Sequence, residues 1–325
     1  MLNYFGKKYT VTSLINNGRF SDIYKCKDYK GKIYALKVVD NIQYKDKVVR
    51  VEKMLTELQK CRSTKYACNA YLINTFGMQG FWCFLTDYYP KNLQQALVEN
   101  GRSFPLEVVQ VLARQLVDAV IILSDNNIIH SDIKPNHILL NSKNDRLKLC
   151  GFDRAEYSYR ININPSFGTA SYRAPEIILG FPGDQKLDVW STALVIFEMA
   201  TNIRLFPGTF NNQILYKQIC TLGSFDWEMI ENCKFKKKHF KDISFVRRVG
   251  PYGEKTIIIN AFHRNNKLRE QLFASAWFLH KWDRANEEKI GELHSLLEQM
   301  LILHPRRRLP IQFVGSSHFL KNVFI

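Results

Sequence analysis

The sequence lacks long apolar runs and paired cysteines, and each absence excludes a class of protein. No stretch reaches the ~18 apolar residues of a membrane-spanning helix, and the first ten residues lack the apolar core of a secretory signal. Seven cysteines are scattered through 325 residues without a C-x-x-C pair or the Cys/His spacing of a zinc site. These absences predict an intracellular protein with reduced thiols and no membrane partner.

Repeats, low-complexity segments and long linkers are absent as well, which argues against a disordered or solenoid protein. Apolar residues make up 46% of the chain and aromatic residues 13%, and both values are typical of a globular protein. The length suffices for one large domain or two moderate domains with a sizeable core.

Acidic residues are few, because 30 of them face 46 lysines and arginines and leave a net charge of +16. Part of the excess is concentrated in residues 234–250, where seven basic residues accompany only Asp242, and in the run Arg306-Arg307-Arg308. A surface of this kind attracts acidic partners such as a ribonucleoprotein, but it is also typical of a merely solvated basic face. No RNA-binding motif is visible, and both interpretations stay open.

The hydrophobic pattern changes after about ninety residues, from the alternation of strands to the period of helices. The first part predicts one helix at 46–62 and five strands, at 9–15, 22–27, 32–39, 71–76 and 81–86. The second part predicts helices at 106–123, 190–200 and 290–303. The middle one of these is apolar on nearly all sides and should be fully buried.

These elements predict an α+β fold with two lobes. The small lobe, residues 1–86, should hold the five-stranded antiparallel sheet and its helix. A polar break at 87–92 is the expected hinge, and 93–325 should form a larger, mostly helical lobe.

Several short segments occur in an order that is familiar from one enzyme family. A turn at 15–23 precedes Ala35-Leu36-Lys37, and the loop His130-Ser131-Asp132-Ile133-Lys134-Pro135 comes about a hundred residues later. Then follow Gly151-Phe152-Asp153 and Ser171-Tyr172-Arg173-Ala174-Pro175-Glu176. In this order and spacing the segments resemble a eukaryotic protein kinase domain, and the resemblance covers nearly the whole chain.

Within that family the chain is similar to the CMGC group. Leu205-Phe206-Pro207-Gly208 resembles the start of that group's insert, which should span about 205–260. The loop at 130–135 and the run 174–180 resemble the pre-mRNA-processing kinases associated with splicing, relatives of the dual-specificity tyrosine-regulated kinases. The resemblance implies one protein kinase domain over 1–325, a serine/threonine kinase type, a protein substrate or partner, and the nucleus in preference to the cytoplasm.

The resemblance also implies an ATP site. Lys37 would hold the α- and β-phosphates, and a helix glutamate would hold Lys37. Glu57 is the expected partner and Glu52 its competitor; five residues are about 140° around a helix, so the two cannot share a face. Backbone groups of Asp87 and Tyr89 would contact adenine. The remaining residues expected around the nucleotide are Ile15, Gly18, Ile23, Ala35 and Leu139.

The same resemblance implies catalytic and structural roles. Asp132 would accept the proton of the substrate hydroxyl, Lys134 would stabilise the transferring phosphoryl group, and Thr169 would hydrogen-bond both. The residues implied to hold the large lobe together are Asp188, under the catalytic loop, and the buried pair Glu176 and Arg308.

Both metal-ligand positions of the family are altered, with His137 at one and Gly151 at the other. Imidazole is a poor ligand for Mg²⁺ though a fair one for Mn²⁺, and glycine has no ligand atom. Asn136 and Asp153 are possible substitutes, but neighbouring side chains in an extended segment point oppositely, and Asp153 is displaced by ~6–7 Å.

Two interpretations therefore stay open. The chain is an inactive or strongly impaired kinase, a pseudokinase or scaffold that binds ATP weakly, or it is an active serine/threonine kinase with a rearranged Mg²⁺ or Mn²⁺ site. The active alternative would act on splicing or nuclear proteins.

Overall fold

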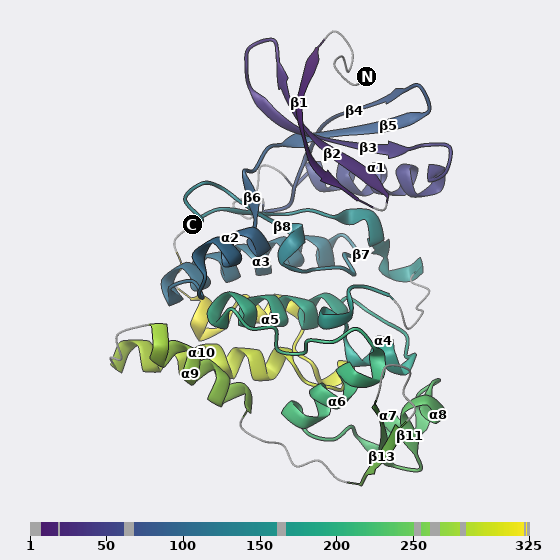
Figure 1. The fold of residues 1–325 in the computed structure, drawn as a ribbon, viewed down its shortest axis with the longest axis vertical. Coiled ribbons are helices and arrows are strands. Elements are labelled where there is room, and N and C mark those ends of the chain that lie inside the picture. Colours follow the sequence, from purple (N-terminus) through teal and green to yellow (C-terminus); the bar gives the residue numbers. More distant parts are fainter. Residues whose placement is uncertain are drawn as a thin grey trace.

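The chain folds into two lobes that follow one another along the long axis of the molecule (Figure 1), as this computed structural model shows. The residues that it describes are 8–18, 20–61, 68–160, 167–249, 255–260, 267–279, 284–321 and 323. None of the helices in these ranges is long and apolar enough to cross a membrane.

The small lobe is a five-stranded antiparallel sheet in the order β1-β2-β3-β5-β4. Its strands are β1 (Tyr9–Asn17), β2 (Ser21–Asp28), β3 (Ile33–Asp40), β4 (Leu72–Met78) and β5 (Phe81–Asp87). The expected strands are thus present, each within a few residues of its predicted bounds. The register places Lys37 of β3 opposite Ile23 of β2, and Ala35 opposite Thr86 of β5. Because residues two apart in a strand share a face, these four side chains lie on one face of the sheet.

The helix of the small lobe is α1 (Lys45–Gln59), which ends three residues before the expected limit. Its buried side chains follow helical spacing, and the last of them is Leu58, so the apolar face that packs against the lobe is complete at that point. The buried residues are Val48, Val51, Met54, Leu55 and Leu58.

The large lobe is built mainly from helices, which are α2 (Leu93–Asn100), α3 (Leu106–Asp125), α4 (Pro175–Leu179), α5 (Lys186–Thr201), α6 (Asn211–Leu222), α7 (Trp227–Asn232), α8 (Lys236–His239), α9 (Lys267–Leu279), α10 (Arg284–Met300) and α11 (Ile311–Val314). Short strands hold its loops, namely β6 (Lys91–Asn92), β7 (Ile128–Ile129), β8 (Ile138–Leu140), β9 (Leu147–Leu149) and β10 (Glu156–Tyr157). The catalytic loop lies between β7 and β8.

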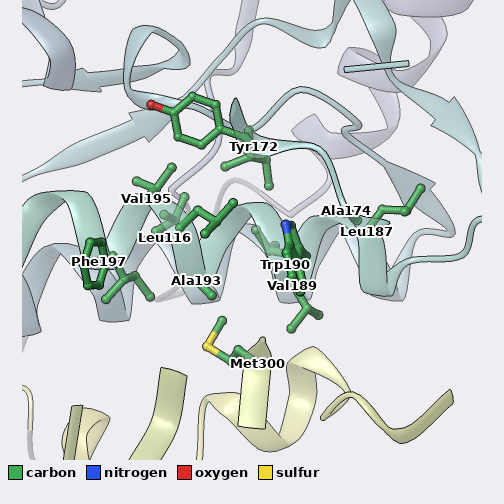
Figure 2. Close-up of a cluster of buried hydrophobic side chains, with 14 of the residues drawn as sticks. Leu116, Tyr172, Ala174, Leu187, Val189, Trp190, Ala193, Val195, Phe197 and Met300 are labelled. Carbon is green, nitrogen blue, oxygen red and sulfur yellow. The ribbon is translucent and has the colours of Figure 1, made fainter. Parts of the chain in front are cut away.

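Helix α5 is the centre of the large lobe, and every residue from Leu187 to Thr201 is buried, as its apolar sequence predicts. Figure 2 shows Trp190 within the surrounding apolar side chains, with Met300 of α10 on one side of α5. The fully buried Trp190 ring stacks on Phe206 at 5.9 Å between ring centroids.

A second small sheet lies at the end of the molecule opposite the small lobe (Figure 1). It consists of β11 (Phe240–Lys241), β12 (Ser244–Val249) and β13 (Lys255–Ile259), within the range expected for the insert. Several basic side chains of this region have partners, since Lys236 pairs with Glu231 at 2.6 Å and Arg247 lies 4.0 Å over the Tyr216 ring. Lys237 and Lys241 are exposed.

The expected link between Glu176 and Arg308 is present as a buried, two-point ion pair. Arg308 Nη1 donates to Glu176 Oε1 at 2.6 Å, and Nη2 donates to Oε2 at 2.8 Å. The two side chains are 1% and 0% exposed, so almost no water reaches either charge. Further donation to the carbonyl oxygens of Ile302 and Lys186 satisfies the guanidinium.

We predict that Arg308→Ala lowers the free energy of unfolding by about 3–5 kcal/mol, because it leaves the Glu176 carboxylate buried without a counter-charge. Urea unfolding followed by circular dichroism would measure the change. Arg307→Ala is the matched control: the Arg307 side chain is 67% exposed, and its loss should cost below about 1 kcal/mol. Equal costs for the two variants would contradict a structural role for the buried pair.

Candidate active site

The catalytic loop brings Asp132, Lys134 and Thr169 together. Thr169 Oγ1 donates to Asp132 Oδ1 at 2.6 Å, and Lys134 Nζ lies 2.9 Å from both Asp132 Oδ2 and Thr169 Oγ1. Burial would raise the pKa of Asp132, but His137, Thr169 and Lys134 outweigh it, and the pKa lies below its ordinary value. The carboxylate is therefore charged and fixed in orientation, as a proton acceptor must be.

Asp188 holds this loop from below, at the start of α5. Its two carboxylate oxygens accept from the backbone N–H of His130 at 2.6 Å and of Ser131 at 2.9 Å. Burial raises the pKa of Asp188 to about 7, although the two N–H donors oppose this rise. Ser131 has a φ of 68°, which is uncommon for a residue other than glycine, so these two hydrogen bonds stabilise a strained turn.

His130 is fully buried next to this turn and packs against Phe152, with 5.0 Å between the ring centroids. Its Nε2–H donates to the Cys150 carbonyl at 2.8 Å. Burial lowers the pKa of His130 to about 4, so the ring is neutral and acts as a packing element.

His137 and Gly151, which stand where the resemblance implies metal ligands, lie against one another. Gly151 has a φ of 87°, and a Cβ built on it would lie 2.5 Å from Cγ of His137. The His137 ring therefore fills the space that a side chain at 151 would need. Its Nδ1–H donates to the Asp132 carbonyl at 2.9 Å, and burial lowers the pKa of His137 below its ordinary value.

The expected ion pair between Lys37 and Glu57 is absent, and this prediction was wrong. Lys37 Nζ pairs with Asp153 Oδ1 at 2.6 Å, while Glu57 Oε2 accepts from the hydroxyl of Tyr157 at 2.7 Å. The competitor Glu52 has no partner for its carboxylate among the described residues.

The reason lies in the short 3₁₀ helix η2 (Phe152–Arg154), which follows Gly151. Phe152 is buried, and this anchor turns Asp153 toward β3. Burial would raise the pKa of Asp153, but the charge of Lys37 outweighs it, and the pKa lies below its ordinary value. Once Lys37 is occupied, Glu57 is free to bind Tyr157.

The residues expected around the nucleotide lie between the β1–β2 turn and the connection after β5. Ile23, Ala35 and Leu139 are half-buried, whereas Ile15 is 47% exposed. The Gly18 N–H donates to the Ser21 carbonyl at 3.0 Å, which closes the turn. Asp87 ends β5, and burial raises the pKa of Tyr89 to about 12, as expected for a phenol packed into the connection.

Two contacts that shape this site, those of Tyr157 and Lys47, could not be predicted from the sequence. Tyr157 holds Glu57, as described above. The Lys47 Nζ lies 3.4 Å from the centroid of the Phe20 ring, beside the β1–β2 turn. Neither residue belongs to a motif of the resemblance. Only the fold brings them to the region around the β1–β2 turn, Lys37 of β3 and Asp153 of η2, which is called the cleft below.

Comparison with known proteins agrees with this geometry. The protein kinase domain family matches residues 9–320. The chain is 30% identical over 312 residues to serine/threonine-protein kinase prp4 of Schizosaccharomyces pombe, an alignment that covers 93% of this chain and 64% of the relative. The chain belongs to the protein kinase family.

Other relatives of this kinase domain point to the CMGC group. It is 29% identical over 237 residues to DYRK-family kinase pom1 of Schizosaccharomyces pombe, covering 72% of this chain and 22% of the relative. It is also 29% identical over 249 residues to dual specificity protein kinase YAK1 of Saccharomyces cerevisiae, covering 73% and 30%. The chain thus spans less than two thirds of the length of these relatives.

The described residues of this kinase domain contain no group of three or more His, Cys, Asp or Glu side chains that could hold a metal ion. Asn136 is exposed, and Asp153 is paired with Lys37. His137 offers a nitrogen, and Gly151 has no side chain.

We predict that Gly151→Ala lowers the free energy of unfolding by about 2–4 kcal/mol, because the new methyl group meets the His137 ring at a positive φ. Urea unfolding of Gly151→Ala, His137→Ala and the double variant would measure this. In the double variant the steric part disappears, so the two costs should fall short of additivity by at least about 1 kcal/mol. Strictly additive costs would show that the two residues do not share this space.

Proposed function

We propose that this chain is a pseudokinase: a CMGC-type kinase domain that binds nucleotide and protein partners without metal-dependent phosphoryl transfer. The packing of His137 against Gly151 carries this proposal, because it fills the place of one ligand with the ring that replaces the other. Metal ions stabilise the charge of the transferring phosphoryl group by several kcal/mol. A loss of ~3–5 kcal/mol would slow turnover by ~10²–10⁴.

The residues present fit ATP better than they fit a metal ion. Ile23, Ala35 and Leu139 offer half-buried apolar side chains to the adenine, and Lys37 lies on the same sheet face as the first two. ATP, when bound, supplies the γ-phosphoryl group. Asp132 is oriented to hold the proton of a hydroxyl group, and Lys134 is placed beside it.

The intact cluster of Asp132, Lys134 and Thr169 favours the alternative, an active serine/threonine kinase with a rearranged metal site. These three residues are those that a phosphoryl transfer needs besides the metal. Their geometry also has a structural explanation, since the hydrogen bonds satisfy a buried carboxylate. The two interpretations differ in one measurable quantity, the transfer of the γ-phosphoryl group.

We expect purified wild-type protein to transfer no more radiolabelled γ-phosphate to a basic generic substrate than Asp132→Asn does, with Mg²⁺ or with Mn²⁺. The double variant His137→Asn, Gly151→Asp is the matched gain-of-function test, since it removes the ring and restores both ligand types. Its rate should exceed that of the wild type by ~10² or more. Transfer by the wild type that Asp132→Asn abolishes would overturn the pseudokinase.

We infer an acidic partner for the basic face formed by α8 and β11, where Lys237 and Lys241 are exposed. A ribonucleoprotein in the nucleus would match both this charge and the resemblance to splicing-associated kinases. Anisotropy of a labelled single-stranded RNA should then show affinity that falls steeply with salt and weakens in Lys237→Glu, Lys241→Glu. Binding that ignores both changes would refute the inference.

A further inference from the structure

A lysine outside the catalytic motifs, Lys47, lies beside the turn between β1 and β2. Its Nζ is 3.4 Å from the ring centroid of Phe20, which follows the turn, and 5.7 Å from that of Tyr44. The two rings also contact each other edge to face, with 5.5 Å between centroids. Aromatic faces attract a charged ammonium group. The rings of Phe20 and Tyr44 therefore hold the ammonium group of Lys47 beside the β1–β2 turn.

Lys47 has no carboxylate within ion-pair distance among the residues that the structure describes. Helix α1, which carries Lys47, contacts η2, which carries Asp153. Burial lowers the pKa of Lys47, and the charge of Asp153 opposes this shift. Asp153 is already paired with Lys37 at 2.6 Å, and Arg50 of the same helix is paired with Glu156 at 2.6 Å. Lys47 is thus a cation that two aromatic rings contact and that no carboxylate of the described residues neutralises.

On the side of the cleft formed by β3, α1 and η2, Lys47 adds a positive charge to the pair of Lys37 and Asp153. A nucleotide polyphosphate is strongly anionic, and kinases normally neutralise it with metal ions in addition to one lysine. If His137 fills the metal position, the phosphates have to be neutralised by side chains, and Lys37 and Lys47 are the cations that could do so.

We propose that Lys37 and Lys47 form a phosphate site that holds a nucleotide polyphosphate without metal, and that Asp153 occupies Lys37 when the site is empty. The inference rests on the proposed function, since it assigns the ligand of the same cleft. Asp153 then competes with the phosphates for Lys37, which is the reverse of a metal ligand's action. This reversal makes the two roles of Asp153 separable by experiment.

The first test measures the affinity of methylanthraniloyl-ATP by fluorescence, with EDTA and with Mg²⁺. Wild type should bind equally well in both. Lys47→Gln should weaken binding about tenfold, the worth of one charge-assisted contact that is partly open to solvent. Lys47→Arg should retain most of the affinity. Lys45→Gln is the matched control, because it removes the same charge from an exposed position in the same helical turn.

Asp153→Asn provides the second test. The direction of the change in affinity for the labelled ATP shows whether Asp153 competes with the phosphates or holds a metal ion. Removal of a competitor should tighten metal-free binding about threefold to tenfold, because Lys37 becomes available to the phosphates. Removal of a metal ligand would instead weaken binding, and only with Mg²⁺ present. The corresponding labelled adenosine, which has no phosphate, should bind all variants equally.

The outcomes separate this inference from the function on which it rests. If wild type needs Mg²⁺ to bind the labelled ATP, the metal-free phosphate site fails, whereas the pseudokinase fails only if the wild type transfers phosphate and Asp132→Asn does not. If binding is independent of metal but Lys47→Gln behaves as Lys45→Gln does, the role of Lys47 alone is overturned. If Asp153→Asn weakens binding in EDTA, Asp153 is not a competitor.

Discussion

The ion pair between Lys37 and Asp153 determines the arrangement of the whole cleft. One lysine charge can be neutralised by one carboxylate, and Asp153 takes that position at 2.6 Å. Glu57 then binds Tyr157, and Lys47 keeps its charge without a carboxylate partner. The partner of Lys37 thus affects three places. These are α1 through Glu57, the segment after η2 through Tyr157, and the β1–β2 turn through Lys47.

In the large lobe, by contrast, the residues that the resemblance implies to be structural have their expected partners. Asp188 fixes the catalytic loop through two backbone N–H groups, and Glu176 pairs with Arg308 at full burial. Both depend on α5, whose side chains are buried on all sides. The substitutions therefore affect the place where a metal ion would bind and leave intact the parts that hold a kinase domain together. The contacts that hold this scaffold together are made by side chains and backbone groups of the described residues.

The sequence sufficed for the lobes, the strands and the pair of Glu176 and Arg308. Strand alternation and helical period are local signals, and the ion pair joins two motif positions that the resemblance identifies. The partner of Lys37 could not be predicted in the same way. The sequence offered two candidates, Glu57 and Glu52, whereas the actual partner, Asp153, comes from a distant segment. Its position depends on how buried Phe152 turns the backbone of η2.

The contact of His137 with Gly151 could not be predicted from the sequence either, although the two residue types indicate it. A large side chain and a glycine stand at the two positions where the resemblance implies ligands of one metal, and such a complementarity of volume indicates neighbours in space. Whether the ring would turn toward the glycine or toward solvent depends on its hydrogen bond to the Asp132 carbonyl, which only the folded loop provides.

The same contact couples the two positions, so that neither can be redesigned alone. An aspartate placed at 151 alone would meet the His137 ring, and an asparagine placed at 137 alone would leave a gap beside a glycine without ligand atoms. Engineering at this point is therefore a two-position problem, in which the volume given up by one residue is the volume that the other needs.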